Sequence, residues 1–96
     1  MTLAIIAITT GGANLARKLH DQVEEAELWL PERFRQSDSS NYYSEKLADL
    51  LPRLFARADG LICIMATGIV VRLLAPHLKT KDQDAAVVVC DEAGQH

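Results

Sequence analysis

Three short groups of residues in this sequence carry the functional groups that could do chemistry, and each follows an apolar run typical of a strand. They are Thr9, Thr10 and Gly11; Thr67, Gly68 and Ile69; and Asp91 and Glu92. Because the carboxyl ends of parallel strands open onto one edge of a sheet, we expect the three groups to share that edge. A carboxylate beside hydroxyl and backbone N–H donors suits general-base chemistry on water or on a ligand hydroxyl, with Asp91 or Glu92 as the base. The same carboxylates are equally compatible with solvating a turn.

The turn at Thr67 and Gly68 lies between an apolar run at residues 61–65 and a helical pattern that stops at Pro76. The first N–H groups of such a helix, at Thr67, Gly68 and Ile69, have no intrahelical acceptor and favour an anionic ligand. Gly68 would let a ligand approach the backbone, and Thr67 would cap the helix or donate its hydroxyl. The alternative is an ordinary strand-to-helix turn that holds no ligand.

Cationic and titratable side chains follow this turn. Arg72, Lys79 and Lys81 could meet ligand carboxylates, and His77 could act as a ligand or an acid–base group. A solvated surface explains these four residues as well.

The elements that must position these groups alternate along the chain. Apolar runs predict strands at residues 3–8, 26–30, 61–65 and 85–90, and helical periodicity predicts helices at 13–24, 44–58 and from about 67 to Pro76. We expect a turn at residues 9–12, an exposed and mobile loop from Glu32 to Tyr43, Ser44 as a helix cap, and a kink or break at Pro52. The order β-α-β-α-β-α-β predicts an α/β fold, a three-layer sandwich with a mainly parallel four-stranded sheet.

Length and composition argue against several other classes of protein. Ninety-six residues form one α/β domain, and a net charge of −3 gives no reason to expect nucleic-acid or membrane-surface binding. Cys63 and Cys90 predict two buried reduced thiols, and with scattered histidines they predict no metal site within the chain. The first ten residues do not resemble a signal peptide and no apolar stretch is long enough to span a bilayer, so we expect a cytoplasmic protein. Gly11 and Gly12 lack the third glycine of a dinucleotide fingerprint.

Several contiguous blocks resemble one known family. The segments IMATGIVVR, APHL, K-x-x-D and AVVV-x-DE, together with the opening LAIIAIT, are similar in order to the amino-terminal domain of the cobalamin biosynthesis protein CbiG family, the cobalt-precorrin-5A hydrolases. The resemblance covers essentially the whole chain. It departs at Asp84-Ala85-Ala86-Val87, where members usually have D-P-A-V, and after residue 96, where members continue into a serine–glycine–histidine segment and a further domain.

This resemblance implies a role in anaerobic cobalamin (vitamin B12) biosynthesis. Such enzymes open the δ-lactone of cobalt-precorrin-5A and release acetaldehyde to give cobalt-precorrin-5B. The substrate, a carboxylate-rich tetrapyrrole, carries the cobalt, so no separate cofactor is expected. It would dock at Thr67, Gly68 and Ile69 with Arg72 and Lys79 nearby.

Two expectations concern what lies beyond the chain. The last strand has no covering helix after it, which predicts a domain incomplete at its C-terminal end, completed by a missing C-terminal domain, a partner or a second copy in a homo-oligomer. The alternative to an enzyme is a non-catalytic corrinoid-binding or interaction domain of the same protein.

Overall fold

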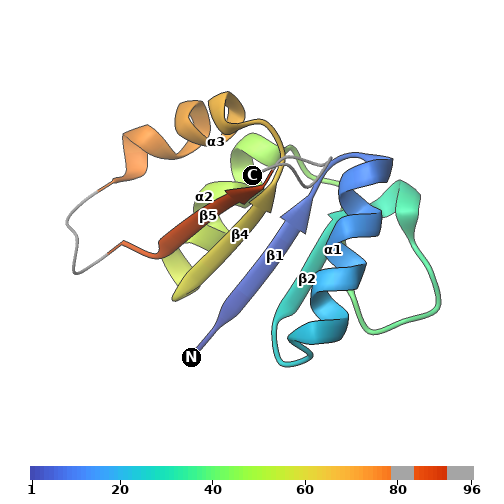
Figure 1. Cartoon of the computed structure of the whole chain (residues 1–96). Coiled ribbons are helices and arrows are strands. Elements are labelled where there is room, and N and C mark those ends of the chain that lie inside the picture. The colour runs from blue at the N-terminus through green and yellow to red at the C-terminus, as the bar shows by residue number, and fades with distance from the viewer. Residues whose placement is uncertain (79–83, 91–96) are drawn as a thin grey trace.

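The computed structural model describes residues 1–78 and 84–90, which form one parallel sheet with helices on both faces. The sheet has the order β3-β2-β1-β4-β5, and every neighbouring pair is parallel. The strands are β1 (Leu3–Ala7), β2 (Glu27–Pro31), β3 (Asn41–Tyr43), β4 (Gly60–Ile64) and β5 (Ala86–Cys90). The helices are α1 (Thr10–Gln22), α2 (Leu47–Arg57) and α3 (Thr67–Leu74), with 3₁₀ turns η1 (Glu32–Phe34) and η2 (Ala75–His77). Figure 1 shows β1, β2, β4 and β5 running in one direction.

The centre of the sheet is β1, which is buried on both faces. Ile5 pairs with Leu28 of β2 and with Ile62 of β4, and the residues from Ala4 to Ala7 are inaccessible to solvent. A continuous apolar run is what a strand covered on both faces requires. The prediction of a buried first strand is therefore confirmed.

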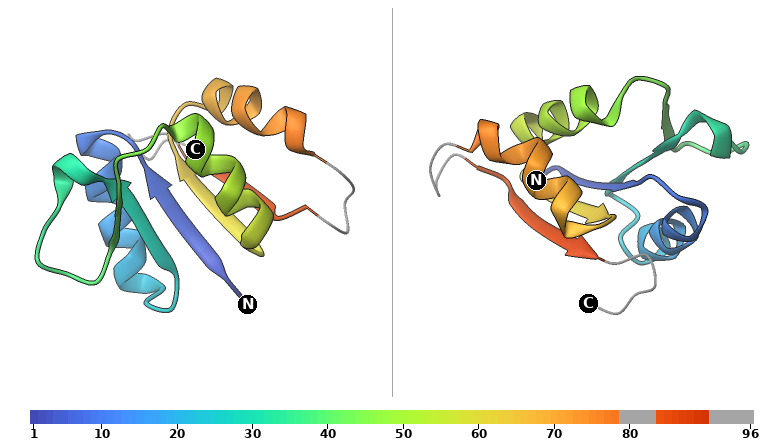
Figure 2. Two further views of the ribbon diagram at one scale, coloured as in Figure 1. Left: turned by 180° about the vertical axis from the view of Figure 1, so that it is seen from behind. Right: turned by 90° about the horizontal axis from the view of Figure 1, so that it is seen from above.

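Alternate residues of the strands point into two separate cores. Ile6 and Leu61 face α2 and α3, whereas Ile5 and Leu28 face α1. Figure 2, in the view from above, shows α2 and α3 on one side of the sheet and α1 on the other. Helices on both faces place the strand ends, and not the sheet faces, where a ligand has access.

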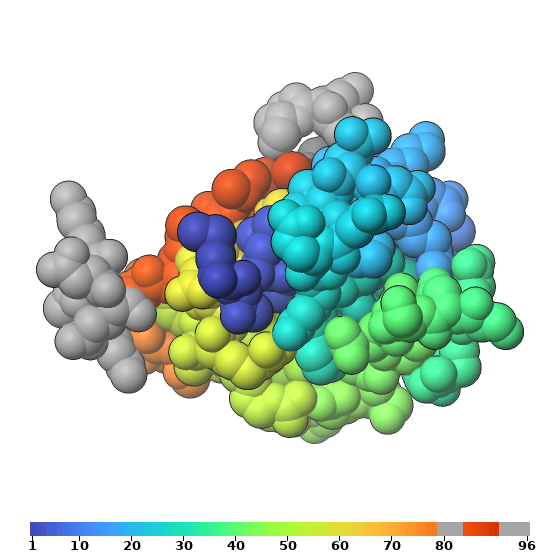
Figure 3. Space-filling model, turned by 90° about the horizontal axis from the view of Figure 1, so that it is seen from below, coloured from blue at the N-terminus to red at the C-terminus, as the bar shows by residue number. Residues whose placement is uncertain are grey.

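The amino ends of the strands are tied together at the opposite edge of the sheet. The Thr2 carbonyl accepts hydrogen bonds from the Asp59 and Gly60 amides at 2.8 and 3.1 Å, and the Thr2 amide donates to the Asp59 carboxylate at 2.7 Å. The space-filling view from this side shows the start of the chain, β4 and β5 packed together (Figure 3). The carboxyl edge is left as the candidate site.

The strand count differs from the prediction because residues 32–43 are not an open loop. They begin with η1 and end with β3, whose Trp29–Asn41 and Pro31–Tyr43 pairings add a fifth strand beside β2. A strand of three residues is too short to show an alternating pattern in the sequence. The expected mobile loop is thus a structured edge of the sheet.

Two details of the predicted helices are also wrong. Helix α1 begins at Thr10, because Thr9 caps it, so the expected turn at residues 9–12 is mostly helix. Helix α2 begins at Leu47 after Lys46, not at a Ser44 cap, and runs unbroken through Pro52. Its buried face, formed by Leu50, Leu51, Leu54 and Phe55, keeps the helix whole despite the missing proline N–H.

The last strand is less buried than predicted. Strand β5 forms an edge of the sheet, and Val88 is 55% exposed on the face that α1 covers elsewhere. Both cysteines are free, but only Cys63 is buried, and Cys90 is half-buried. Burial, with a smaller effect of Cys90, raises the pKa of Cys63 to about 12, so its thiol stays protonated. Among the described residues, no helix is long and apolar enough to cross a membrane.

Candidate functional site

The candidate site lies at the carboxyl ends of β1 and β4. We call this edge the crevice, because open α/β sheets hold their ligands in a crevice outside these strand ends. These strands are neighbours in the sheet, yet β1 leads into α1 on one face and β4 leads into α3 on the other. The two helices therefore begin on either side of the same edge (Figures 1 and 2). This reversal in strand order is the point where open α/β sheets bind ligands.

The start of α1 leaves two residues facing solvent. The Thr9 hydroxyl accepts a hydrogen bond from the Gly12 amide at 3.0 Å, and the Thr9 carbonyl accepts one from the Ala13 amide at 2.7 Å. Thr10 and Gly11 follow this cap and are exposed. Of the three predicted residues here, Thr9 caps the helix, and the predicted ligand contacts of Thr10 and Gly11, which are exposed, stay predictions.

The start of α3 is more open. Its N-cap is Ala66, which has no side chain able to cap, so Thr67 is the first helical residue and not the cap. The Ile69 amide donates to the Ala66 carbonyl at 3.1 Å, whereas Thr67 and Gly68 are exposed. A Cβ atom built on Gly68 would meet nothing within 4 Å. The Thr67 and Gly68 amides, which have no intrahelical acceptor, are therefore the donors that this crevice offers.

Other predicted residues lie elsewhere or outside the described residues. Arg72 is exposed in the last turn of α3, and His77 lies beyond the helix in η2. Since α3 has eight residues, His77 is more than about 12 Å along the chain from Thr67. It lines a hollow of about 270 Å³ with Pro52 and Asp84, away from the crevice. Lys79, Lys81, Asp91 and Glu92 lie outside the described residues. Their predicted roles stay predictions.

Two residues at the same edge, Arg33 and Tyr43, were not predicted from the sequence. Both line a hollow of about 390 Å³ at the carboxyl ends of β1, β2 and β3. The Tyr43 hydroxyl donates to the Ala7 carbonyl at 2.9 Å, and burial raises the pKa of Tyr43 to about 12. One feature of the sequence could have indicated Arg33: it lies two residues after the end of β2, where the carboxyl edge of the sheet is expected.

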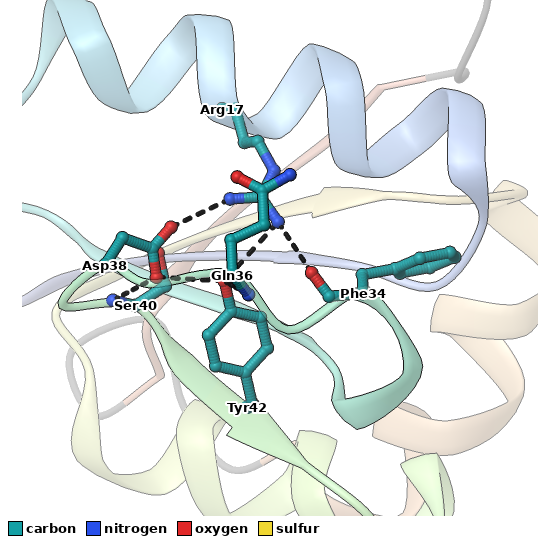
Figure 4. Close-up of polar contacts among 6 residues, drawn as sticks. All are labelled: Arg17, Phe34, Gln36, Asp38, Ser40 and Tyr42. Atoms are coloured by element: carbon teal, nitrogen blue, oxygen red, sulfur yellow. Dashed lines mark hydrogen bonds and ion pairs between the residues drawn. The ribbon is translucent and has the colours of Figure 1, made fainter.

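The segment that carries Arg33 is held against α1 by a network around Arg17 (Figure 4). The Arg17 guanidinium donates to the Asp38 carboxylate and to the Phe34 carbonyl, each at 2.9 Å. The Tyr42 hydroxyl donates to Asp38 at 2.9 Å, and the Ser40 amide donates to it at 3.1 Å. Burial works to raise the pKa of Asp38, but these hydrogen bonds outweigh it and the net shift is downward. The carboxylate thus stays ionised and fixes the segment.

The described residues at this edge offer hydrogen-bond donors and cations. Across residues 1–78 and 84–90, no group of three or more histidine, cysteine, aspartate or glutamate side chains is placed to hold a metal ion. What the described arrangement can do is bind anionic groups and stabilise developing negative charge.

The fold defines this chain as an α/β domain with a parallel sheet, helices on both faces and two helix amino termini at its switch point. The chain belongs to the Cobalamin synthesis G N-terminal family, whose sequence profile matches residues 49–96. It is 37% identical over 97 residues to the cobalt-precorrin-5A hydrolase of Priestia megaterium and 36% identical over 95 residues to that of Salmonella typhimurium.

These relatives are much longer than the chain. The alignments cover 97% and 99% of the chain but 26% of each relative. The fold also matches a crystal structure of a cobalamin biosynthesis protein G homolog from Sulfolobus solfataricus, with a TM-score of 0.63 and 14% sequence identity. The match covers 97% of this chain and 26% of the homolog's chain. At that identity the likeness concerns the fold. The chain therefore spans about a quarter of the length of the relatives it matches.

Proposed function

We propose that this chain is the part of a cobalt-precorrin-5A hydrolase that docks the substrate lactone and stabilises the charge formed when it opens. The observation that supports this most directly is the meeting of the α1 and α3 amino termini at one crevice. The products would be cobalt-precorrin-5B and acetaldehyde, and the cobalt would enter with the substrate. Further domains of the whole protein would complete the site.

The reaction asks for two things from the protein, first a base and second donors for the oxyanion. A base takes a proton from water as its oxygen adds to the lactone carbonyl, donors hold the oxyanion, and the ring C–O bond then breaks to leave a carboxylate and an alcohol. Loss of the alcohol proton lets the C20 carbon and its methyl group depart as acetaldehyde. The electron pair of the broken carbon–carbon bond stays on the macrocycle, which takes up a proton.

The described residues suit the second task. The Thr67 and Gly68 amides are exposed at the start of α3, and Thr10 and Gly11 are exposed at the start of α1. Ile69 would add apolar contact with the ring, and Arg72 would meet a carboxylate at its margin. Asp91 or Glu92, which follow β5, would supply the base; His77 and Lys79 would contact the periphery of so large a ligand.

A non-catalytic corrinoid-binding domain is the second candidate. It is favoured by the residues described at the crevice, where Thr10, Gly11, Thr67 and Gly68 provide hydroxyl and N–H groups but no carboxylate or imidazole. In that case the base would come from another part of the protein.

One experiment separates the two candidates. The protein that contains this chain is incubated with cobalt-precorrin-5A while released acetaldehyde and substrate affinity are both measured, for the wild type and for Asp91→Asn and Glu92→Gln. Loss of a general base should lower the turnover rate by about 10²- to 10⁴-fold with little change in affinity.

Each result has a definite meaning. Undiminished turnover in both variants, with binding intact, would refute the base assignment and favour the binding-domain candidate. No binding and no acetaldehyde from the wild type would refute the proposed function as a whole.

A further inference from the structure

A third hollow adjoins the crevice and is lined by several cationic side chains. It measures about 310 Å³ and lies between the start of α1 and the segment after β2, with Thr10 shared between the hollow and the exposed helix start. Its polar lining consists of Thr10, Asn14, Arg17, Arg33, Arg35 and Gln36. Three of these side chains are cationic and none is anionic, so the hollow favours a negatively charged group.

The three arginines of this hollow differ in what neutralises them. Arg17 is paired with Asp38 at 2.9 Å, and Arg35 holds Glu32 with two hydrogen bonds of 2.6 and 2.7 Å. Arg33 instead donates to the uncharged Ile8 carbonyl at 2.7 Å and stacks over the Phe34 ring at 4.5 Å. Within the described ranges it makes no ion pair, so its charge and its remaining N–H donors are available to a ligand.

The neighbouring hollow of about 390 Å³ does not share this character. Arg33 lines it too, but so do the Glu32 and Glu45 carboxylates. Glu32 is paired with Arg35 and Glu45 with Arg53. An anion on that side would still lie beside two carboxylates, which makes the arginine-lined side the favourable one.

We propose that the arginine-lined hollow binds one carboxylate side chain of the tetrapyrrole, with Arg33 as the charge partner. A volume of about 310 Å³ lies at the low end for ligand pockets, so it suits an acetate or propionate arm and not the ring itself. The forked N–H donors of the Arg33 guanidinium match the two oxygens of a carboxylate. Its contacts with the Ile8 carbonyl and the Phe34 ring hold the guanidinium in place. This inference rests on the proposed function, since it supplies the anchor that orients the lactone at the crevice beside it.

The test compares two probes in wild type, Arg33→Gln and Arg33→Lys. One probe is a cobalt corrinoid with free acetate and propionate side chains, and the other is the same corrinoid with those side chains amidated. Titration calorimetry should show Arg33→Gln weakening the free-acid probe by about tenfold or more, with Arg33→Lys intermediate and the amidated probe unaffected. Arg57→Gln serves as the control, because Arg57 pairs with Glu27 away from the hollow. Thermal melting confirms that each variant is folded.

A separate titration keeps this inference distinguishable from the proposed function. Glutarate, a small dicarboxylate, should produce saturable NMR shifts at the Arg33 side chain and the Asn14 amide of the wild type and none in Arg33→Gln. Wild-type affinity of Arg33→Gln for the free-acid corrinoid, or equal weakening for both corrinoids, would overturn the inference while leaving the function in place. If neither corrinoid binds the wild type, the proposed function fails. The glutarate titration then tests by itself whether the hollow binds a carboxylate: saturable shifts would support an anion site, and no shifts would refute it.

Discussion

Gly12 and Gly68 lie in the first turns of α1 and α3, but their surroundings differ. A Cβ atom on Gly12 would lie 3.0 Å from the Thr9 hydroxyl oxygen and 3.3 Å from the Ile64 carbonyl oxygen, whereas one on Gly68 would lie in open space. Gly12 therefore lies at a close contact between α1 and the end of β4, where a larger residue would force its neighbours to shift. A Cβ atom on Gly68 meets none of the described residues, which fits the proposed approach of a ligand to this part of the backbone.

This contrast gives a prediction at the residue scale. Gly68→Ala should leave the free energy of unfolding unchanged or raise it by up to about 1 kcal/mol, because alanine favours helix. Corrinoid affinity should nevertheless fall about tenfold as the methyl group keeps the ring from the backbone. Urea denaturation and a binding titration measure the two effects.

The matched variant is Gly12→Ala, which should lose about 1–3 kcal/mol of stability through overpacking. Wild-type corrinoid affinity in Gly68→Ala would show that the ligand does not approach α3 at this residue.

At the scale of elements, α2 contains a local conflict. Pro52 has no N–H to donate to the carbonyl of Ala48, one turn earlier, and Ala48 is exposed, so water has access to that region. Burial of Leu50, Leu51, Leu54 and Phe55 keeps the helix intact. The apolar face thus outweighs the missing hydrogen bond.

Pro52→Ala should therefore stabilise the protein. Restoring the hydrogen bond should raise the free energy of unfolding by about 1–2 kcal/mol, the gain being reduced by the greater freedom of the unfolded chain. Urea denaturation tests this. Arg53→Ala on the exposed side of the same helix is the control, and its loss of the Glu45 ion pair should cost less than about 1 kcal/mol. An unchanged or lower stability of Pro52→Ala would mean that the proline packs well enough to offset its missing donor.

At the scale of the whole molecule, one ion pair joins segments that are far apart in the sequence. Arg57 at the end of α2 donates two hydrogen bonds to Glu27 at the start of β2, at 3.0 and 2.5 Å. These bonds from Arg57, with another from the Trp29 indole, hold the pKa of Glu27 below its ordinary value despite partial burial. The pair links the covering helix to the sheet at its amino edge.

This shift predicts how stability depends on pH. Because the folded-state pKa of Glu27 is lowered, the stabilisation is complete above the ordinary glutamate pKa and is lost as the pH falls through the folded-state value. Urea denaturation from about pH 7 to about pH 3 should therefore show a smaller acid loss of stability in Arg57→Gln than in the wild type. Identical pH profiles would show that the pair contributes nothing to acid sensitivity.

Strand β5 forms one edge of the sheet, and such an edge is a place where a second copy of the chain could associate. Val88 is exposed there, while Val87 and Val89 on the same strand pack against α3 and its neighbours. Self-association, expected from the sequence, stays a prediction, and sedimentation measurements over a range of concentrations would test it.

The sequence by itself determined the elements that depend on local patterns. The apolar runs of β1 and β4 and the helical stripes of α1 and α2 were visible because burial imposes a period on each. The contiguous blocks from Ile64 to Glu92 were enough to predict the family, and the profile match and the relatives confirm it.

Only the tertiary structure shows which segments that are distant in the sequence lie next to one another. Strand order places β1 beside β4, and only this brings Thr10 and Thr67 to one edge of the sheet. The anchoring of Arg33 depends on a carbonyl 25 residues earlier in the chain. Such contacts leave no period in the sequence, because they arise from the packing of distant segments and not from the neighbours of each residue.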